Sequence, residues 1–129
     1  MERLNVMMVD DSSVAAHVLS SILTNLGHKV VRTARTGAEA VIGYRACNPD
    51  VLIMDITMPG MDGIAATEKI LASCPDARII VVTSHAEKRV VIKAQAAGAK
   101  SYLLKPIHPD KLRDTLEDVM RADLTTLNS

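Results

Sequence analysis

The chain contains no phenylalanine and no tryptophan, and its aromatic side chains are limited to Tyr44 and Tyr102. The core must therefore be aliphatic, and a hydrophobic content of 48% in 129 residues is enough to fill one domain. An excess of charge is missing too, because 15 basic and 15 acidic residues cancel. This balance argues against the broad positive field that direct nucleic-acid or anionic-membrane binding requires.

Long hydrophobic runs and a cysteine framework are also absent. The first apolar run, Val6 to Val9, is followed by Asp10 and is too short for a signal-peptide core or a membrane span. Cys47 and Cys74 fall at the ends of predicted helices without metal-ligand spacing, so we expect free thiols, which favour a reducing compartment. Together these absences predict a soluble, cytoplasmic protein without membrane insertion.

Five short apolar runs rich in Val, Ile, Leu and Met are each too short for a helix and predict β-strands. Four of them are nearly continuous, which is typical of a parallel sheet covered on both faces. The second run is more mixed, as an edge strand would be. The predicted strands are residues 4–9, 28–33, 51–54, 78–83 and 101–104.

A helical pattern separates each of these runs from the next, and a fifth helix follows the last run. Capping residues predict several of the helix ends: Gly27 closes the first helix, and Pro109 opens the fifth. Capping-box patterns open two others. The predicted helices are residues 14–26, 36–47 (capping box Thr36 to Glu39), 63–73, 84–97 (capping box Ser84 to Glu87, ending at Gly98) and a segment from Pro109 that turns Leu112, Leu116, Val119 and Met120 inward.

This alternation predicts a (βα)₅ protein of the α/β class. Right-handed crossovers then give a doubly wound, five-stranded parallel sheet, for which the flavodoxin-like strand order 2-1-3-4-5 is expected. We expect residues 1–122 to form this one domain, and residues 123–129 to be a tail or the start of a linker.

Polar residues follow four of the predicted strands directly. Ligands of open α/β sheets bind beyond the carboxyl ends of the strands, so these residues are expected to meet at one edge. Any one set alone would be an ordinary turn or helix cap, and capping of the first helix is a real alternative for the two adjacent aspartates. The four sets are Asp10-Asp11, Asp55, Thr83-Ser84 and Lys105-Pro106.

Three carboxylates in one crevice require a cation, because even at an effective dielectric near 20 a pair about 4 Å apart costs roughly 4 kcal/mol. Carboxylate oxygens with room for water and phosphate match the way Mg²⁺ is held. Lys105 adds a point charge and Thr83 a hydroxyl donor for phosphoryl oxygens. The site therefore suits a phosphoryl group, with Asp55 as nucleophile, whereas the sequence contains no Walker A loop, no GxGxxG and no HExxH.

These motifs together resemble the receiver domain of two-component response regulators, especially the chemotaxis-type single-domain members. The resemblance covers residues 4 to about 121. It rests on Asp10-Asp11-Ser12, the stretch from Ile53 to Gly63 around Asp55, Thr83-Ser84, Gly98-Ala99, Tyr102 and Lys105-Pro106.

The resemblance implies a phosphorylation-controlled switch rather than an independent enzyme. Asp55 would accept a phosphoryl group from a sensor histidine kinase or phosphotransfer protein. Mg²⁺ would be bound by Asp10, Asp11, Asp55 and the backbone carbonyl of Thr57.

The resemblance also implies how the signal would leave the site. Lys105, preceding a cis peptide to Pro106, would contact the phosphoryl group. Thr83 would move inward and Tyr102 would follow it into a buried rotamer. An output protein or effector domain would read the surface formed by the fourth helix, fifth strand and fifth helix.

Other interpretations of the same residues remain open at this level. Tyr102 is also compatible with a plain strand position, and His85 and Thr57 with an influence on the attacking water. An aspartate-nucleophile phosphohydrolase is a rival, although such enzymes usually place a second Asp two residues after the nucleophile, where this chain has Thr57. A receiver-like interaction module that no longer uses phosphate is another.

Overall fold

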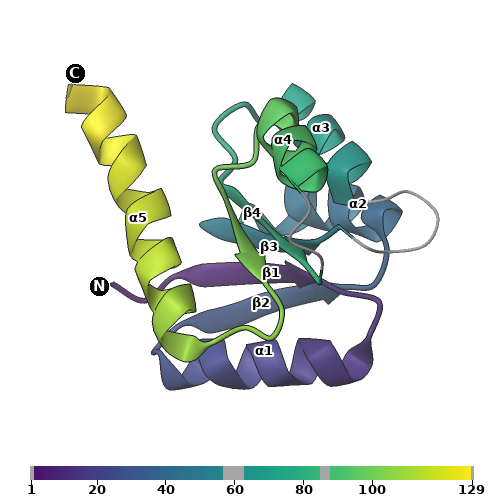
Figure 1. The fold of residues 1–129 in the computed structure, drawn as a ribbon, viewed down its shortest axis with the longest axis vertical. Coiled ribbons are helices and arrows are strands. Elements are labelled where there is room, and N and C mark those ends of the chain that lie inside the picture. Colours follow the sequence, from purple (N-terminus) through teal and green to yellow (C-terminus); the bar gives the residue numbers. More distant parts are fainter. Residues whose placement is uncertain (1, 57–62, 85–87, 129) are drawn as a thin grey trace.

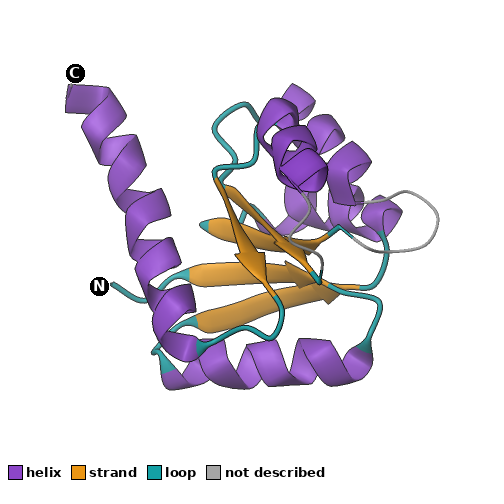
Figure 2. Cartoon of the chain, in the orientation of Figure 1, coloured by secondary structure: helices purple, strands orange, loops and turns teal. Residues whose placement is uncertain are grey.

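The computed structural model describes residues 2–56, 63–84 and 88–128, with the backbone alone for 122–128. Its five strands form one parallel sheet in the order β2-β1-β3-β4-β5, as predicted. Figure 2 shows this twisted sheet between two layers of helices. The strands are β1 (Asn5–Val9), β2 (Lys29–Ala34), β3 (Val51–Asp55), β4 (Ile79–Thr83) and β5 (Ser101–Leu104).

The helices divide between the two faces of the sheet, which confirms the doubly wound, flavodoxin-like architecture. Helices α1 and α5 cover one face, and α2, α3 and α4 cover the other (Figure 1). Across the described ranges, none of the helices combines the length and apolar character that crossing a bilayer requires. The helices are α1 (Ser13–Asn25), α2 (Gly37–Cys47), α3 (Gly63–Ser73), α4 (Lys88–Ala97) and α5 (Pro109–Asn128).

Local signals in the sequence account for several helix ends. The side chain of Ser12 accepts a hydrogen bond from the Ala15 N–H at the start of α1, and Thr36 does the same for Glu39 at the start of α2. Gly27 and Gly98 have positive φ angles of 94° and 105°, the left-handed conformation in which glycine commonly ends a helix.

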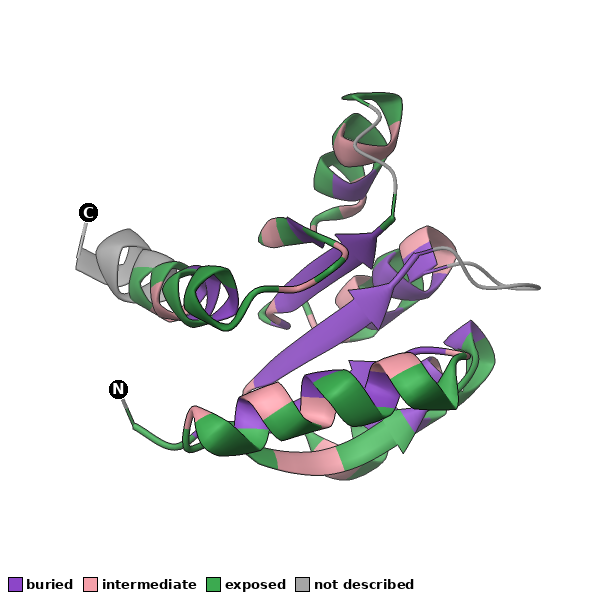
Figure 3. Cartoon of the chain, turned by 60° about the horizontal axis from the view of Figure 1, so that its bottom comes forward, coloured by how far each residue is buried: buried purple, intermediate pink, exposed green. Residues whose placement is uncertain are grey.

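The core consists of two aliphatic layers, one on each side of β1, β3 and β4. Every residue of β3 and β4 is buried, whereas β2 and β5 at the edges are partly exposed (Figure 3). Met7, Met8 and Met54 are fully buried, so methionine fills space that phenylalanine often takes. Tyr44 packs into the same core at 5% exposure, as expected.

Four details differ from the sequence-based expectation or fall outside the described residues. His28, for which the sequence suggests a surface or capping position, is 6% exposed. Strands β2 and β3 each extend one residue beyond the predicted end, to Ala34 and Asp55. Helix α5 continues to Asn128, through the segment that we expected to be loose. The capping box predicted for α4 includes residues 85–87, which are not described.

Candidate functional site

The predicted site residues lie at the carboxyl edge of the sheet. Asp10 directly follows β1, Asp55 and Thr83 end β3 and β4, and Lys105 directly follows β5. These four strands are consecutive neighbours in the sheet. The parallel strand order therefore brings Asp10 and Lys105, which are 95 positions apart in the sequence, within hydrogen-bonding distance.

Three carboxylates converge at this edge. One ligand oxygen from each of Asp10, Asp11 and Asp55 lies within 4.8 Å of the other two. Asp10 and Asp55 are buried at 6% and 3% exposure, whereas Asp11 is accessible to solvent. Negative charges that lie this close together and are largely shielded from water repel one another, so the ionised cluster needs a nearby cation to be stable.

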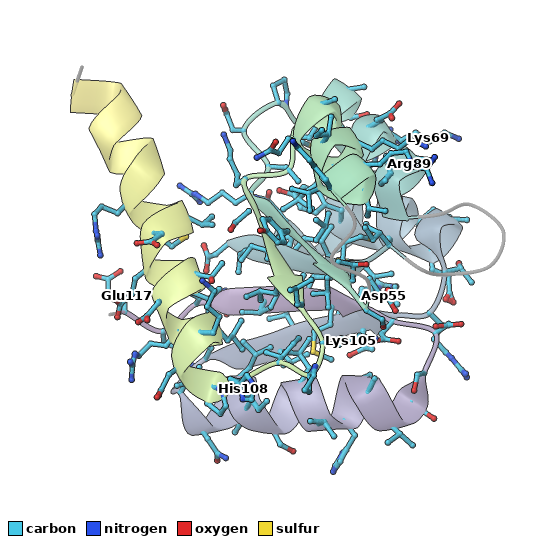
Figure 4. The ribbon with its side chains drawn as sticks, viewed as in Figure 1. Asp55, Lys69, Arg89, Lys105, His108 and Glu117 are labelled. Atoms are coloured by element: carbon cyan, nitrogen blue, oxygen red, sulfur yellow. The ribbon has the colours of Figure 1, made fainter. Side chains whose placement is uncertain are left out.

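Lys105 supplies one such cation. Its Nζ donates to Asp10 Oδ2 at 3.1 Å and to Asp55 Oδ2 at 3.3 Å, with the lysine side chain 27% exposed. Figure 4 shows Lys105 and Asp55 close together at the end of the sheet. Burial alone would lower the pKa of Lys105, but the hydrogen bonds and negative charges of Asp10 and Asp55 outweigh it and raise this pKa.

The local hydrogen bonds separate the metal-binding hypothesis from the capping alternative. The N-cap of α1 is Ser12, and its backbone N–H donates to Asp10 Oδ1 at 2.9 Å. The Asp11 carboxylate makes no hydrogen bond or ion pair with any residue in the described ranges. Asp10 thus shapes the turn before α1, while Asp11 is left available for a ligand.

The donor set fits Mg²⁺. Its oxygens come from carboxylates, one of which lacks a protein partner within the described part of the chain, and one lysine leaves the three negative charges incompletely balanced. Thr57, whose carbonyl the resemblance adds to the ligands, lies outside the described residues. The same is true of His85.

Thr83 and Tyr102 occupy neighbouring strands beside this cluster. Thr83 is 1% exposed, and its carbonyl accepts from the Lys105 N–H at 2.9 Å. Tyr102 lies on β5, paired with Val81, and is 41% exposed. The peptide between Lys105 and Pro106 is cis, as expected.

An apolar groove of about 420 Å³ opens beside the carboxylates and was not anticipated from the sequence. Val18, Leu19 and Ile22 of α1 line one side, and Ile107 lines the other. Val18 is 53% exposed, although its helical spacing with Leu19 and Ile22 is also compatible with a core position. The sequence did contain a sign of this groove, because α1 has more apolar residues than a single buried face of a helix requires.

A larger concavity, about 680 Å³, lies at the opposite edge of the sheet. Arg78 and Lys100 in its wall are matched by Asp50 and Asp76, and the Arg78 guanidinium donates to the Asp50 carbonyl. This concavity is larger than the groove beside the carboxylates. We place the functional site at the carboxylate cluster because, among the described residues, buried charged groups at the carboxyl ends of the strands, where ligands of such sheets bind, occur at this cluster.

A five-stranded parallel sheet in this order, with an acidic cluster and a lysine at its carboxyl edge, defines a receiver-type α/β domain. The sequence model for "Response regulator receiver domain" matches residues 6–117. The chain therefore belongs to the response regulator receiver domain family, a family of signalling domains.

Within this family, the chain is similar to chemotaxis proteins over nearly their whole length. Chemotaxis protein CheY of Thermotoga maritima is 39% identical over 116 residues, 90% of this chain and 97% of that protein. Response regulator UvrY of Escherichia coli is 38% identical, but the match covers only 54% of its length.

A solved complex of CheX and CheY with BeF₃ and Mg²⁺ from Borrelia burgdorferi contains a similar chain. The TM-score is 0.85 at 35% identity, covering 90% of this chain and 88% of that one. These matches also decide against a phosphohydrolase on a merely similar sheet.

Proposed function

We propose that this chain is a phosphorylation-controlled switch in two-component signalling, in which Asp55 accepts a phosphoryl group in a Mg²⁺-dependent reaction. The observation that carries the proposal is the bridge from Lys105 to two buried carboxylates, beside an Asp11 carboxylate without a partner in the described ranges. Membership in the receiver family and similarity to a CheY found with BeF₃ and Mg²⁺ support it.

The donor would be the phosphohistidine of a sensor histidine kinase or of a phosphotransfer protein. An Asp55 carboxylate oxygen attacks phosphorus while the bond from phosphorus to the donor's imidazole nitrogen breaks, and that nitrogen keeps the electron pair. Lys105, already 3.3 Å from Asp55, would neutralise a phosphoryl oxygen. Mg²⁺, held by Asp10, Asp11, Asp55 and the Thr57 carbonyl, would supply the remaining charge neutralisation.

Signal loss would follow from hydrolysis of the same bond. Water attacks phosphorus, the bond to the Asp55 oxygen breaks, and inorganic phosphate leaves with Asp55 regenerated. The chain would thus catalyse its own phosphorylation and dephosphorylation without turning over a metabolite, and a cytoplasmic location belongs to this proposal.

The apolar groove beside Asp55 would receive the donor. Phosphorus must come within bonding distance of the Asp55 carboxylate, so the donor's surface must cover what adjoins it. That surface is the groove between α1 and Ile107, with Val18 at its rim. We therefore assign the groove to an apolar surface of the donor next to its phosphohistidine.

The output would be read on another face. Thr83, buried at the end of β4, would move toward a phosphoryl oxygen, and Tyr102 on the adjacent strand would follow it. Ile92 of α4 is 53% exposed, and Leu104, on the same strand as Tyr102, is 42% exposed. An effector would bind this α4–β5–α5 face, and no direct contact with nucleic acid is proposed.

The test is incubation with acetyl phosphate and Mg²⁺, followed by intact mass measurement. We expect a gain of about 80 Da, the mass added when a carboxylate becomes an acyl phosphate. Asp55→Asn should show no gain, and chelation of Mg²⁺ with EDTA should abolish the gain in the wild type. A wild-type protein that stays at its starting mass under conditions that phosphorylate a CheY protein refutes the proposal.

A further inference from the structure

Gly63, the first residue of α3, lies directly against the backbone that carries the acceptor. A Cβ atom on Gly63 would overlap the carbonyl oxygen of Asp55 and would stand 2.8 Å from both Cα and Cγ2 of Ile56. Ordinary van der Waals contacts of a Cβ begin at 3.4 Å. A side chain at this position therefore cannot be added unless α3 or the end of β3 moves.

Backbone conformation does not explain the glycine. Among the described glycines, positive φ angles occur at Gly27 and Gly98, not at Gly63. Alanine is moreover a better helix former than glycine. The requirement at this position is space.

Hydrogen bonds fix both the end of β3 and the first turn of α3, the two segments that meet at Gly63. The Ile56 N–H donates to the carbonyl of Val82 at 3.1 Å, which ties the acceptor strand to β4. On the helix side, the hydroxyl of Thr67 donates to the Gly63 carbonyl at 2.7 Å, and Thr67 is fully buried. Movement of the end of β3 would strain the Ile56 bond to β4, and movement of the first turn of α3 relative to the rest of that helix would strain the Thr67 bond.

We infer that Gly63 is a positioning residue for the acceptor, and this rests on the proposed function of Asp55. The close approach of α3 fixes the backbone of Asp55 and so fixes the distance from its carboxylate to Lys105 and to Asp10 and Asp11. Displacements of a fraction of an ångström matter here, because a misplacement of about 1 Å in a reacting group can cost a hundredfold in rate.

The test compares Gly63→Ala with Gly43→Ala. Gly43 is also a buried glycine within a helix, but its added Cβ would meet the far ends of the Met7 and Arg32 side chains, at 2.9 Å and 3.0 Å, which can turn away. We expect Gly63→Ala to gain the phosphoryl group from acetyl phosphate about tenfold more slowly at saturating donor. Gly43→Ala should react at the wild-type rate, and urea unfolding reports the stability of both variants.

Two further variants distinguish positioning from packing. Adding Ile56→Ala to Gly63→Ala removes the Cγ2 contact but leaves both backbone contacts, so the slow rate should persist; recovery of the wild-type rate overturns the inference. Thr67→Val keeps the buried volume but releases the Gly63 carbonyl, and it should slow phosphorylation severalfold. A wild-type rate in Thr67→Val also overturns the inference, even if Gly63→Ala does not fold.

Calorimetric titration with Mg²⁺ separates this inference from the proposed function. If the wild type gains no phosphoryl group, the proposed function fails, yet Mg²⁺ affinity still reports the relative positions of Asp10, Asp11 and Asp55. We expect Gly63→Ala to bind Mg²⁺ severalfold more weakly than Gly43→Ala. Equal affinities would contradict the positioning role.

Discussion

Lys105 and His28 are basic side chains that are partly or fully buried, and their surroundings shift their pKa values in opposite directions. Lys105 lies between two carboxylates that raise its pKa, so it stays charged throughout the physiological range. His28 is enclosed at 6% exposure, and burial lowers its pKa below 6.5. Its Nδ1 accepts a hydrogen bond from the Leu4 N–H at 3.1 Å, a bond that only the neutral ring can accept.

His28 should make the fold sensitive to mild acid. Because its folded pKa lies below the unfolded value of 6.5, the unfolded chain binds the proton more readily. The stabilisation is present above pH 6.5 and is lost as the pH falls from 6.5 through the folded pKa. His28→Asn, which keeps an acceptor near the Nδ1 position, should flatten the decline in unfolding free energy between pH 7 and 5.

The matched control is His108→Asn. His108 is exposed directly before α5, so its replacement controls for the loss of a histidine that is not enclosed by packed elements. Urea unfolding at several pH values measures both variants. An unchanged slope in His28→Asn would mean that the buried ring does not set the acid sensitivity.

At the scale of single elements, α1 uses both of its sides. Leu19 and Leu23 face the sheet at 7% and 0% exposure, whereas Val14 and Val18 point outward at 74% and 53%. Exposed apolar residues beside a groove are typical of interaction surfaces. The helix therefore has one side that packs on the sheet and one exposed apolar side, which we propose contacts the phosphodonor.

Val18→Asn should separate the donor's access from the chemistry. Because Val18 is half exposed, the substitution should change the unfolding free energy by no more than about 0.5 kcal/mol. Phosphorylation by acetyl phosphate should be unchanged, while transfer from a phosphorylated histidine phosphotransfer domain should slow about tenfold. Rapid-quench kinetics with both donors measures the difference.

Ile42→Asn provides the comparison for Val18. Ile42 is 69% exposed on α2, which covers the other face of the sheet. It should be phosphorylated normally by both donors. If Val18→Asn behaves like Ile42→Asn with the protein donor, the groove is not the docking surface.

At the scale of the whole molecule, β4 and β5 connect the acidic edge to the proposed output face. Thr83 contacts the Lys105 backbone across these strands, and Tyr102 lies on the same edge strand, 41% exposed. A phosphoryl group that binds one arrangement of Thr83 better than another shifts the equilibrium by that difference in affinity.

Thr83→Ala should therefore uncouple phosphorylation from the switch. The variant should still gain mass with acetyl phosphate, because Asp55 and Lys105 are intact, but Tyr102 should not change its environment. The chain has two tyrosines, so fluorotyrosine labelling should give two ¹⁹F NMR signals. Tyr44 of α2, buried at 5% exposure, serves as the internal reference.

In the wild type, the Tyr102 signal should shift on addition of acetyl phosphate and Mg²⁺ while the Tyr44 signal stays in place. The same Tyr102 shift in Thr83→Ala would show that the hydroxyl is not needed for coupling. No shift in the wild type, despite a gain in mass, would remove Tyr102 from the switch.

Much of the fold could be predicted because the sequence repeats one local pattern. Continuous runs such as Val51 to Met54 mark strands buried on both faces, and residues such as Gly27 and Pro109 mark helix ends. The helix from Gly63 to Ser73 was predicted with its observed bounds. The burial of His28 and the exposure of Val18 were not predicted, because burial depends on which elements pack over a side chain and not on its neighbours in sequence.

The sequence by itself determined the alternation of strands and helices and the chemistry available at the strand ends, since both follow from local residue order and from the parallel direction of the strands. Tertiary structure alone decided which of those groups touch. The Lys105 bridge, the different surroundings of Asp10 and Asp11, the groove beside α1 and the close approach of Gly63 to Asp55 depend on how separate elements pack together. That packing of the helices on the twisted sheet is encoded by no local pattern.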